Sequence, residues 1–149
     1  MFGLNASQLD QFTWIGGQFQ PEQWVKLHNL GLRAVLSLQA ERIDTFHGTP
    51  PERALRLPVP DFYPPTIEQL REGVAFIQQA HADQLPVYIH CHAGIGRAPL
   101  TTAAFLIAKG LNSDQALAAI RRVRPIIDLN QRQIERLREW EQAHREEPG

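Results

Sequence analysis

Hydrophobic residues in this chain fall into short apolar runs and into longer stretches where apolar positions recur at helical spacing. The short runs are typical of buried strands, and they predict strands at residues 12–15, 32–38, 55–59 and 87–89. In residues 32–38 the apolar character is nearly continuous, which indicates a strand that is covered on both faces of a parallel sheet.

The longer stretches predict helices at residues 21–29, 41–47, 67–82, 100–109, 114–123 and 131–145. Two of these helices begin at a pair of residues with the spacing of a capping box, in which a cap side chain and a glutamine three positions later bond to each other's backbone. The pairs are Thr66 with Gln69 and Asn130 with Gln133.

Strands that alternate with helices predict an α/β fold with a central, mainly parallel sheet of four to five strands, flanked by helices on both faces. Ligand sites in such sheets lie at the carboxyl ends of the strands. With 149 residues, 43% of them hydrophobic, the chain is long enough for one domain with a substantial core, and we expect residues 1–149 to form it.

Composition narrows the choice of partners. A net charge of −1 favours neither nucleic acid nor an anionic membrane as a partner. Residues 1–11 lack the basic and apolar regions of a signal peptide, and no apolar run approaches the length that spans a bilayer. The single cysteine fits a reducing compartment. We therefore expect a cytoplasmic, monomeric protein.

Residues 91–97, between the last predicted strand and the next helix, combine a thiol, two glycines and a guanidinium. The segment begins with Cys91, contains Gly94 and Gly96, and ends with Arg97. A glycine-containing loop at a helix N-terminus directs several backbone N–H groups toward one point, which forms an anion site. Amide donors and a nearby arginine also favour an ionised thiolate. The loop predicts a thiolate nucleophile on the floor of an oxyanion pocket, which suits phosphoryl transfer.

Two other interpretations apply to the cysteine. It could be a small buried hydrophobic residue before an ordinary glycine turn. It could also form a metal site with His90 and His92, but alternate residues of an extended segment point in opposite directions, and no further cluster completes a ligand set. We expect no metal and no cofactor.

The motif His90-Cys91-x5-Arg97 resembles the signature loop of the cysteine-dependent protein tyrosine phosphatases, and the chain is most similar to their small, atypical dual-specificity members. The resemblance implies that Cys91 attacks phosphorus, that Arg97 clamps the equatorial oxygens, and that His90 orders the loop by hydrogen bonding. The phosphate-binding residues are then His92, Ala93, Gly94, Ile95, Gly96 and Arg97.

A carboxylic acid on a separate loop is the expected proton donor to the leaving group, and Asp61 is the candidate. It follows a predicted strand in a proline-rich segment, thirty residues before Cys91, and the segment resembles the general-acid loop of small dual-specificity phosphatases. Aspartate also favours turns and caps, which is the alternative. Asp44 and Asp128 are other carboxylates, which look exposed and have no comparable context.

Ala98 departs from the family pattern, in which a serine or threonine follows the loop arginine and helps the sulfur to leave. Arg97-Ala98-Pro99 is similar to the same three residues in phosphatases of the regenerating-liver type. We expect an intact attack step and slow hydrolysis of the phosphoenzyme, unless the hydroxyl of Thr101 or Thr102 reaches back to the sulfur.

The last third of the chain offers two further candidates. Gln133 has the spacing of a glutamine that positions water in a subset of small family members, and the alternative is its capping box alone. Arg121, Arg122 and Arg124 form either a solvated basic face or a secondary contact for acidic phosphosubstrates.

Only His92 among the inner loop residues could be cationic, whereas lipid phosphatases of the family place lysine or arginine there. This favours a phosphoprotein or phosphopeptide substrate that carries phosphotyrosine, with phosphoserine and phosphothreonine as further candidates. Phe62 and Tyr63 either flank the phosphotyrosine ring or close the core. Phosphoinositides and other phosphomonoesters remain an alternative.

Rival classes also remain open. A phosphate-binding pseudophosphatase or interaction module with little turnover is one, and Ala98 favours it. Arsenate reductases and low-molecular-weight phosphatases carry their Cys-x5-Arg near the N-terminus, unlike this chain. A rhodanese-like or cell-cycle phosphatase would leave Asp61 unexplained.

Overall fold

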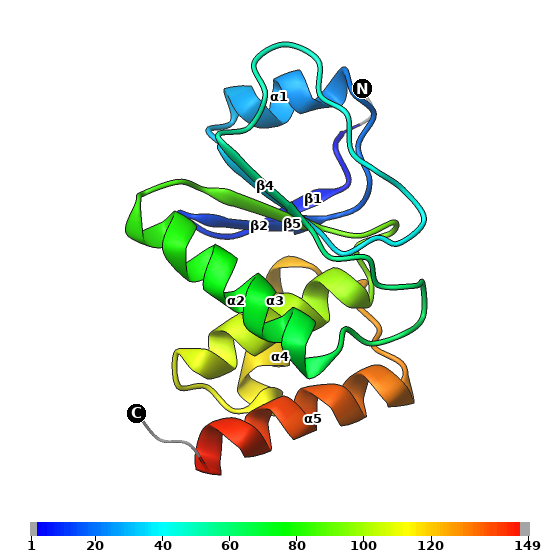
Figure 1. Cartoon of the computed structure of the whole chain (residues 1–149), viewed down its shortest axis with the longest axis vertical. Coiled ribbons are helices and arrows are strands. Elements are labelled where there is room, and N and C mark those ends of the chain that lie inside the picture. Colours follow the sequence, from blue (N-terminus) through cyan, green and yellow to red (C-terminus); the bar gives the residue numbers. More distant parts are fainter. Residues whose placement is uncertain (1–2, 147–149) are drawn as a thin grey trace.

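A mixed sheet of five strands forms the centre of the computed structural model, which describes residues 3–146 (Figure 1). The order across the sheet is β1-β2-β5-β3-β4, and only the β1–β2 pair is antiparallel. The strands are β1 (Ala6–Asp10), β2 (Thr13–Gly16), β3 (Ala34–Ser37), β4 (Arg53–Arg56) and β5 (Val87–His90). The mainly parallel sheet that the sequence predicts is confirmed.

Strand β5 occupies the middle of the sheet and determines where the site lies. Its last residue, His90, pairs with Gly16 of β2 on one side and with Ser37 of β3 on the other. Because these three strands are parallel, their carboxyl ends meet at one edge of the sheet. Cys91 is the first residue beyond that edge.

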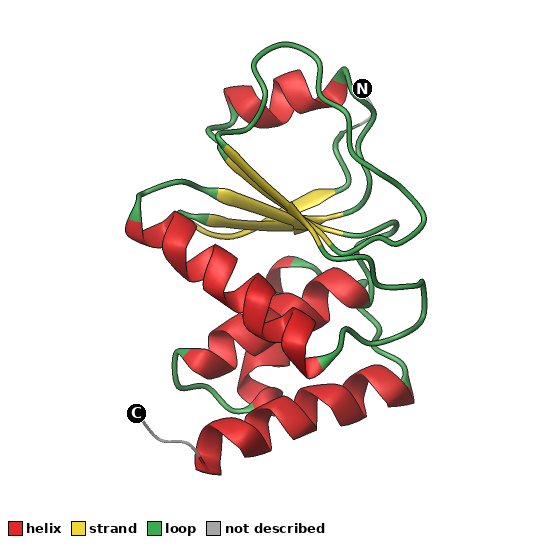
Figure 2. Ribbon diagram, in the orientation of Figure 1, coloured by secondary structure: helices red, strands yellow, loops and turns green. Residues whose placement is uncertain are grey.

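Five helices cover the two faces unequally (Figures 1 and 2). Helix α1 lies on one face, and the other four lie on the opposite face, which confirms helices on both faces. Their bounds are α1 (Gln23–Asn29), α2 (Ile67–Ala82), α3 (Arg97–Ala108), α4 (Ser113–Val123) and α5 (Gln131–Glu146). Within residues 3–146, none is long and apolar enough to cross a membrane.

The sheet separates two apolar clusters because successive side chains of a strand point to opposite faces. Along β5, Val87 and Ile89 belong to the larger cluster under α2 to α5, and Tyr88 belongs to the smaller one beside α1. The smaller cluster consists of Phe19, Trp24, Leu27, Leu32, Val35 and Tyr88. All four residues of β5 are buried, so the strand provides a rigid base for the loop that follows it.

Capping boxes start three of the helices. The box of Thr66 and Gln69 at α2 forms as the sequence predicts, and Asn112 with Gln115 forms a further box at α4. At α5 the Gln133 N–H donates to Asn130 Oδ1 at 3.0 Å, and the Asn130 N–H donates to Gln133 Oε1 at 3.0 Å.

Two expectations about elements are wrong, and one strand was not predicted. Residues 41–47 form an irregular loop and not a helix, because their side chains contact different parts of the fold. Phe46, for example, packs on Trp24 at a centroid distance of 5.2 Å. Strand β1 was not expected, since its polar sequence hides the strand pattern and its pairing with β2 forms it. Strand β4 ends at Arg56, so residues 57–59 leave the sheet as an extended segment.

Candidate active site

The loop of residues 91–96, between β5 and α3, is held from outside by backbone hydrogen bonds. The Gln18 N–H donates to the His92 carbonyl at 2.9 Å, and the Asp128 N–H donates to the Ile95 carbonyl at 2.9 Å. Gly94 has a φ of +72°, and an added Cβ would lie 2.5 Å from the carbonyl carbon of Gly16. The turn of the loop therefore requires glycine at position 94.

A cavity of about 400 Å³ opens inside this loop and brings most of the predicted site residues together. Its lining comprises Asp61, Phe62, Cys91, His92, Ala93, Ile95, Gly96, Arg97, Asp128, Asn130 and Gln133. Gly94 and His90 are not in this lining: Gly94 packs against β2 behind the loop, and His90 lies under it.

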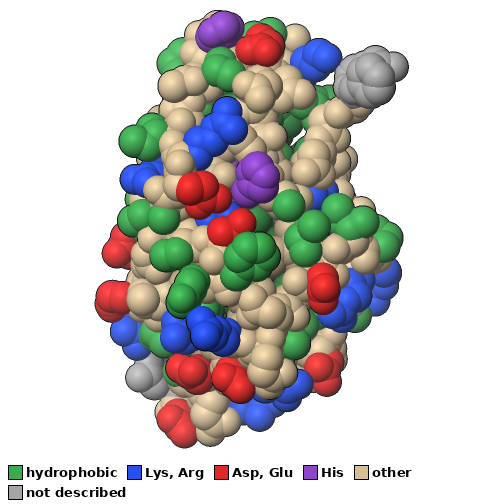
Figure 3. All heavy atoms as spheres, turned by 90° about the vertical axis from the view of Figure 1, so that its right-hand side faces the viewer, with side chains coloured by type: hydrophobic (Ala, Val, Ile, Leu, Met, Phe, Trp, Pro, Cys, Tyr) green, Lys and Arg blue, Asp and Glu red, His purple; other side chains and the backbone are tan. Residues whose placement is uncertain are grey.

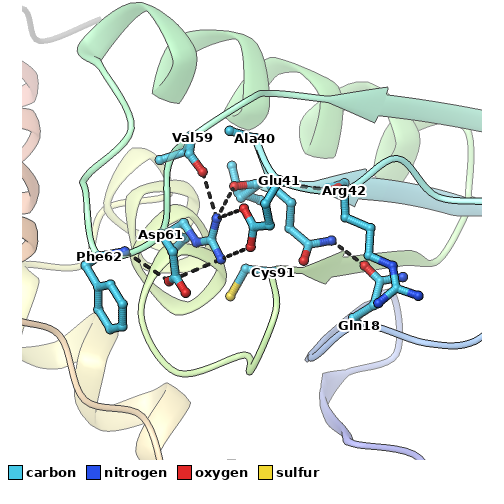
Figure 4. A network of polar contacts seen from close by, with 12 residues as sticks. Gln18, Ala40, Glu41, Arg42, Val59, Asp61, Phe62 and Cys91 are labelled. Carbon is cyan, nitrogen blue, oxygen red and sulfur yellow. Dashed lines mark hydrogen bonds and ion pairs between the residues drawn. The ribbon is translucent and has the colours of Figure 1, made fainter.

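Arg97, the first residue of α3, is buried, and a carboxylate fixes its guanidinium (Figure 4). Nη1 and Nη2 lie 2.8 Å from the two carboxylate oxygens of Glu41, and Nη1 also donates to the Val59 carbonyl at 2.7 Å. The hydrogen bonds to Arg97 lower the pKa of Glu41 from 4.5 to about 2, although partial burial opposes them. The planar fork is thus held at one edge in a single orientation.

Cys91 and Asp61 also lie close to this guanidinium. Figure 4 shows the labelled side chains of Glu41, Asp61 and Cys91 gathered in one place. Asp61 Oδ1 is 3.2 Å from Arg97 Nη2, and the Cys91 side chain is 2% exposed at the floor of the cavity. Burial lowers the pKa of Arg97, but the Glu41 hydrogen bonds and the charges of Cys91 and Asp61 outweigh it and raise the pKa above its usual value. Arg97 is therefore a permanent cation beside the sulfur.

Asp61 is part of a tight turn with an unusual backbone. Its side chain is 47% exposed, and Oδ1 accepts a hydrogen bond of 2.9 Å from the Phe62 N–H. Phe62 has a φ of +68°, in the left-handed region, and its ring is exposed at the rim of the cavity. Asn130 Nδ2 donates to the Phe62 carbonyl at 2.8 Å.

His90 is fully buried beneath the loop. Its Nε2 lies 2.7 Å from Asp44 Oδ2, and its ring stacks on Tyr88 at 5.4 Å between centroids. The expectation that Asp44 is exposed is wrong: its side chain is 8% exposed and also accepts a hydrogen bond from Gln18. Asp44 fixes the orientation of His90.

Arg124 lies behind the loop, and both expectations for it are wrong. Its guanidinium is buried and donates to the carbonyls of Gly94 at 2.7 Å and Ala93 at 2.9 Å. It also donates to Asn5 Oδ1 at 2.6 Å and to Ser7 Oγ at 3.1 Å. Burial lowers the pKa of Arg124 from its usual value. Arg124 therefore supports the loop and belongs to neither a solvated face nor a substrate contact.

Gln133 takes part in the capping box of α5 and also lines the cavity, so its two interpretations are compatible. A Cβ on Gly96 would lie 2.8 Å from Gln133 Nε2, so the amide packs directly on the loop. The hydroxyls of Thr101 and Thr102 instead donate at 2.9 Å to the carbonyls of Arg97 and Ala98. Neither hydroxyl replaces the one that Ala98 lacks.

Four residues have places in the site that the sequence did not predict: Glu41, Asp44, Arg124 and Asn130. Glu41 and Asp44 follow the buried strand β3 at the same sheet edge as Cys91, and this position was a usable signal. No comparable signal marked Arg124. Among residues 3–146, no three side chains of His, Cys, Asp or Glu lie together as a metal site would require.

A cysteine and an arginine at the two ends of one strand-to-helix loop, on a sheet of this topology, place the chain among the cysteine-dependent phosphatases. The family model "Dual specificity phosphatase, catalytic domain" matches residues 14–143. The chain belongs to this family of phosphoric monoester hydrolases, among its small atypical members.

Individual relatives agree with this family. The chain is 26% identical to dual specificity protein phosphatase Mpk3 of Drosophila melanogaster over 125 residues, 83% of this chain and 30% of that protein. It is 35% identical to phosphatidylglycerophosphatase and protein-tyrosine phosphatase 1 of Mus musculus over 77 residues, 51% and 40% of the two chains. It spans less than half the length of these curated relatives.

A solved structure, Tk-PTP in its active form, superposes with a TM-score of 0.82 at 28% identity, covering 93% of this chain and 97% of that one.

Proposed function

We propose that this protein hydrolyses phosphotyrosine, and also phosphoserine and phosphothreonine, in proteins or peptides through a cysteinyl-phosphate intermediate. The observation that carries the proposal is the cavity that Cys91, Arg97 and Asp61 line together. It supplies a nucleophile, an oxyanion clamp and a proton donor within one cavity of about 400 Å³.

In the first step the Cys91 thiolate attacks phosphorus, and the bond between phosphorus and the ester oxygen breaks. Asp61, in its protonated form, gives its proton to the leaving oxygen. Arg97 and the backbone amides of residues 92–97 stabilise the charge on the equatorial oxygens. The contacts of Arg97 with Glu41 and Val59 support this role, because they fix the guanidinium before substrate arrives.

In the second step a water molecule attacks phosphorus, and the Asp61 carboxylate takes one of its protons. The bond between phosphorus and sulfur breaks, the sulfur leaves as a thiolate, and inorganic phosphate is released. No hydroxyl at position 98 assists the departing sulfur. Gln133 orients the attacking water in this proposal, and its position in the wall of the cavity supports that role.

The lining of the cavity supports a singly phosphorylated substrate. Arg97 is its only arginine, and the described lining contains no lysine. The Phe62 ring, 73% exposed at the rim, and Ile95 in the lining offer apolar surface to an aromatic ring. A substrate with several phosphates would find no second cationic clamp in the cavity.

A phospholipid monoester is the second candidate. The similarity to a mouse protein named phosphatidylglycerophosphatase favours it, and a single terminal phosphate on a small headgroup needs no further cation. The two candidates share the chemistry and differ in what surrounds the phosphate.

The purified chain should hydrolyse p-nitrophenyl phosphate in the presence of a chelator, with inhibition by vanadate. Cys91→Ser and Arg97→Lys should each abolish turnover, and Arg121→Lys, an exposed arginine on α4, serves as the control. Phosphotyrosine peptides should be better substrates than phosphothreonine peptides or vesicles that contain phosphatidylglycerophosphate. Binding of phosphopeptide without turnover would identify an interaction module, and a clear preference for the vesicles would replace the protein substrate with the lipid.

A further inference from the structure

We propose that Asn130 is a positioning residue for Asp61: it caps α5 and, with the other end of the same amide, holds the turn that presents the acid. The inference rests on the proposed function, in which Asp61 is the general acid. Asn130 also lies in the lining of the cavity, so the tie is made next to the reacting groups.

The Asn130 amide has two partners, Gln133 and Phe62, which are 71 positions apart in the chain. Its Oδ1 accepts the hydrogen bond from the Gln133 N–H at 3.0 Å, which is the cap of the helix. Its Nδ2 donates to the Phe62 carbonyl at 2.8 Å, across 68 residues of sequence. The cap therefore leaves the donor end of the amide directed at residues 60–65, the acid loop that carries Asp61.

The bond to Phe62 falls at a residue of the acid loop whose backbone is in the left-handed region. Phe62 is not glycine, yet its φ is +68°, in a region that residues with a Cβ rarely adopt. In this conformation its N–H donates to Asp61 Oδ1 at 2.9 Å. A relaxed backbone at Phe62 would turn both its N–H and its carbonyl, so the tie at the carbonyl also preserves the hydrogen bond that orients Asp61.

Two neighbours on α5 hold the rest of the loop. The Arg132 guanidinium lies 5.1 Å from the centre of the Tyr63 ring, and Arg136 donates to the Pro65 carbonyl. These contacts hold residues 63–65 against the helix. Asn130, by contrast, bonds directly to Phe62, the residue that follows Asp61 and donates to its carboxylate.

Capping alone does not require asparagine, because serine and aspartate cap helices equally well. The chain contains a matched case in Asn112, which forms the same box with Gln115 at the start of α4. There the Gln115 N–H donates to Asn112 Oδ1 at 2.8 Å, and within residues 3–146 Nδ2 of Asn112 has no protein partner. A comparison of the two positions separates positioning from capping.

The test uses Asn130→Ser and Asn130→Asp, which keep a cap acceptor and lose the amide donor, with Asn112→Ser and Asn112→Asp as controls. Serine adds no charge and aspartate preserves the shape, so agreement between them excludes a charge effect. Each variant is assayed on p-nitrophenyl phosphate, whose leaving group needs little protonation, and on phenyl phosphate, whose leaving group depends on the acid.

We expect both Asn130 variants to lose about tenfold in kcat on phenyl phosphate, the factor for one lost hydrogen bond of about 1.4 kcal/mol, and clearly less on p-nitrophenyl phosphate. Their Tm values should match those of the Asn112 variants. In an Asp61→Asn background, Asn130→Ser should cause no further loss, because the group that it positions is gone.

Equal losses on the two substrates, effects no larger than those of the Asn112 variants, or losses that multiply with Asp61→Asn would overturn the inference. The proposed function fails differently: the unmodified chain would then not turn over either substrate, or Asp61→Asn would not affect phenyl phosphate more than p-nitrophenyl phosphate. Either of these results would remove the inference as well.

Discussion

Single side chains fix the orientation of the Arg97 guanidinium, the proposed phosphate clamp. Arg97 is 1% exposed, and a buried cation is tolerated only where partners compensate for its lost hydration. Both carboxylate oxygens of Glu41 accept hydrogen bonds from the guanidinium, and the Val59 carbonyl is a third acceptor. The same contacts that make burial tolerable also orient the guanidinium.

Glu41 should make the stability of the protein depend on pH in the acid range. Its pKa is about 2 in the folded chain against 4.5 ordinarily, so its contribution is fully present above pH 4.5 and is lost as the pH falls toward 2. Because the carboxylate is 40% exposed, we expect a modest effect. In Glu41→Gln, urea unfolding midpoints should fall less steeply over this range than in the unmodified chain. Glu68→Gln, on the exposed face of α2, is the control, and equal slopes in all three proteins would contradict the prediction.

Ala98 should determine which of the two chemical steps limits turnover. A hydroxyl at this position would stabilise the departing thiolate, so Ala98→Ser should raise steady-state turnover about tenfold, the value of one charge-assisted hydrogen bond. The attack step, measured as a pre-steady-state burst of leaving group, should stay unchanged. Ala108→Ser, at the far end of α3, is the matched control. Unchanged turnover in Ala98→Ser would exclude slow hydrolysis as the limiting step.

At the level of the secondary-structure elements, the loop is held between parts of the chain that are distant in sequence. Arg124, at the end of α4, connects the carbonyls of Ala93 and Gly94 to Asn5 and Ser7 in the N-terminal segment. The buried guanidinium thus joins α4, the loop and β1.

Removal of this connection should weaken both stability and activity. Arg124→Met leaves the Gly94 carbonyl and Asn5 Oδ1 without the Arg124 donor, while the Ala93 carbonyl keeps only its hydrogen bond from Asn5 Nδ2. We expect a loss of about 3 kcal/mol in unfolding free energy. Catalytic efficiency should fall as well, because the loop is no longer fixed. Arg121→Met, at an exposed position on the same helix, should change stability by less than about 0.5 kcal/mol. Urea denaturation and kcat/KM measure the two effects, and similar values for both variants would refute the role of Arg124.

The elements that could be predicted are those whose own sequence determines them. Helix α2 has a capping box and an apolar face, and it occurs over the predicted residues 67–82. Residues 41–47 have helical spacing, yet Glu41, Asp44 and Phe46 each contact a different part of the fold, and a helix could not satisfy all three. Tertiary contacts override local propensity there. In strand β1, tertiary contacts create an element instead of preventing one: its sequence predicts no strand, and its pairing with β2 forms it.

The candidate site divides in the same way. Cys91, Arg97 and Asp61 could be proposed from the sequence because Cys91 and Arg97 belong to one motif and Asp61 stands at a typical spacing from it. The residues that hold them in place could not, since Glu41 and Arg124 act through contacts that only the folded chain creates.

In the molecule as a whole, Cys91 lies where the buried strand β5 ends and the cavity begins. The sheet and its two apolar clusters are buried, and the face with the strand ends carries acidic and basic side chains side by side, with no extended field of one sign (Figure 3). A neutral solute therefore meets no long-range field of one sign on its way to this face.

Peroxide is such a neutral solute, and the 149 residues contain a single cysteine. Reaction of the Cys91 thiolate with hydrogen peroxide gives a sulfenic acid and hydroxide, and no second thiol of this chain can reduce it through an internal disulfide. We expect peroxide to abolish turnover, vanadate in the cavity to slow that loss, and dithiothreitol to restore activity. A cyclic sulfenamide, if it forms, would also need an external thiol to reopen. Mass spectrometry should locate the added oxygen on Cys91, and recovery of activity without any added thiol would show that the sulfur is protected in another way.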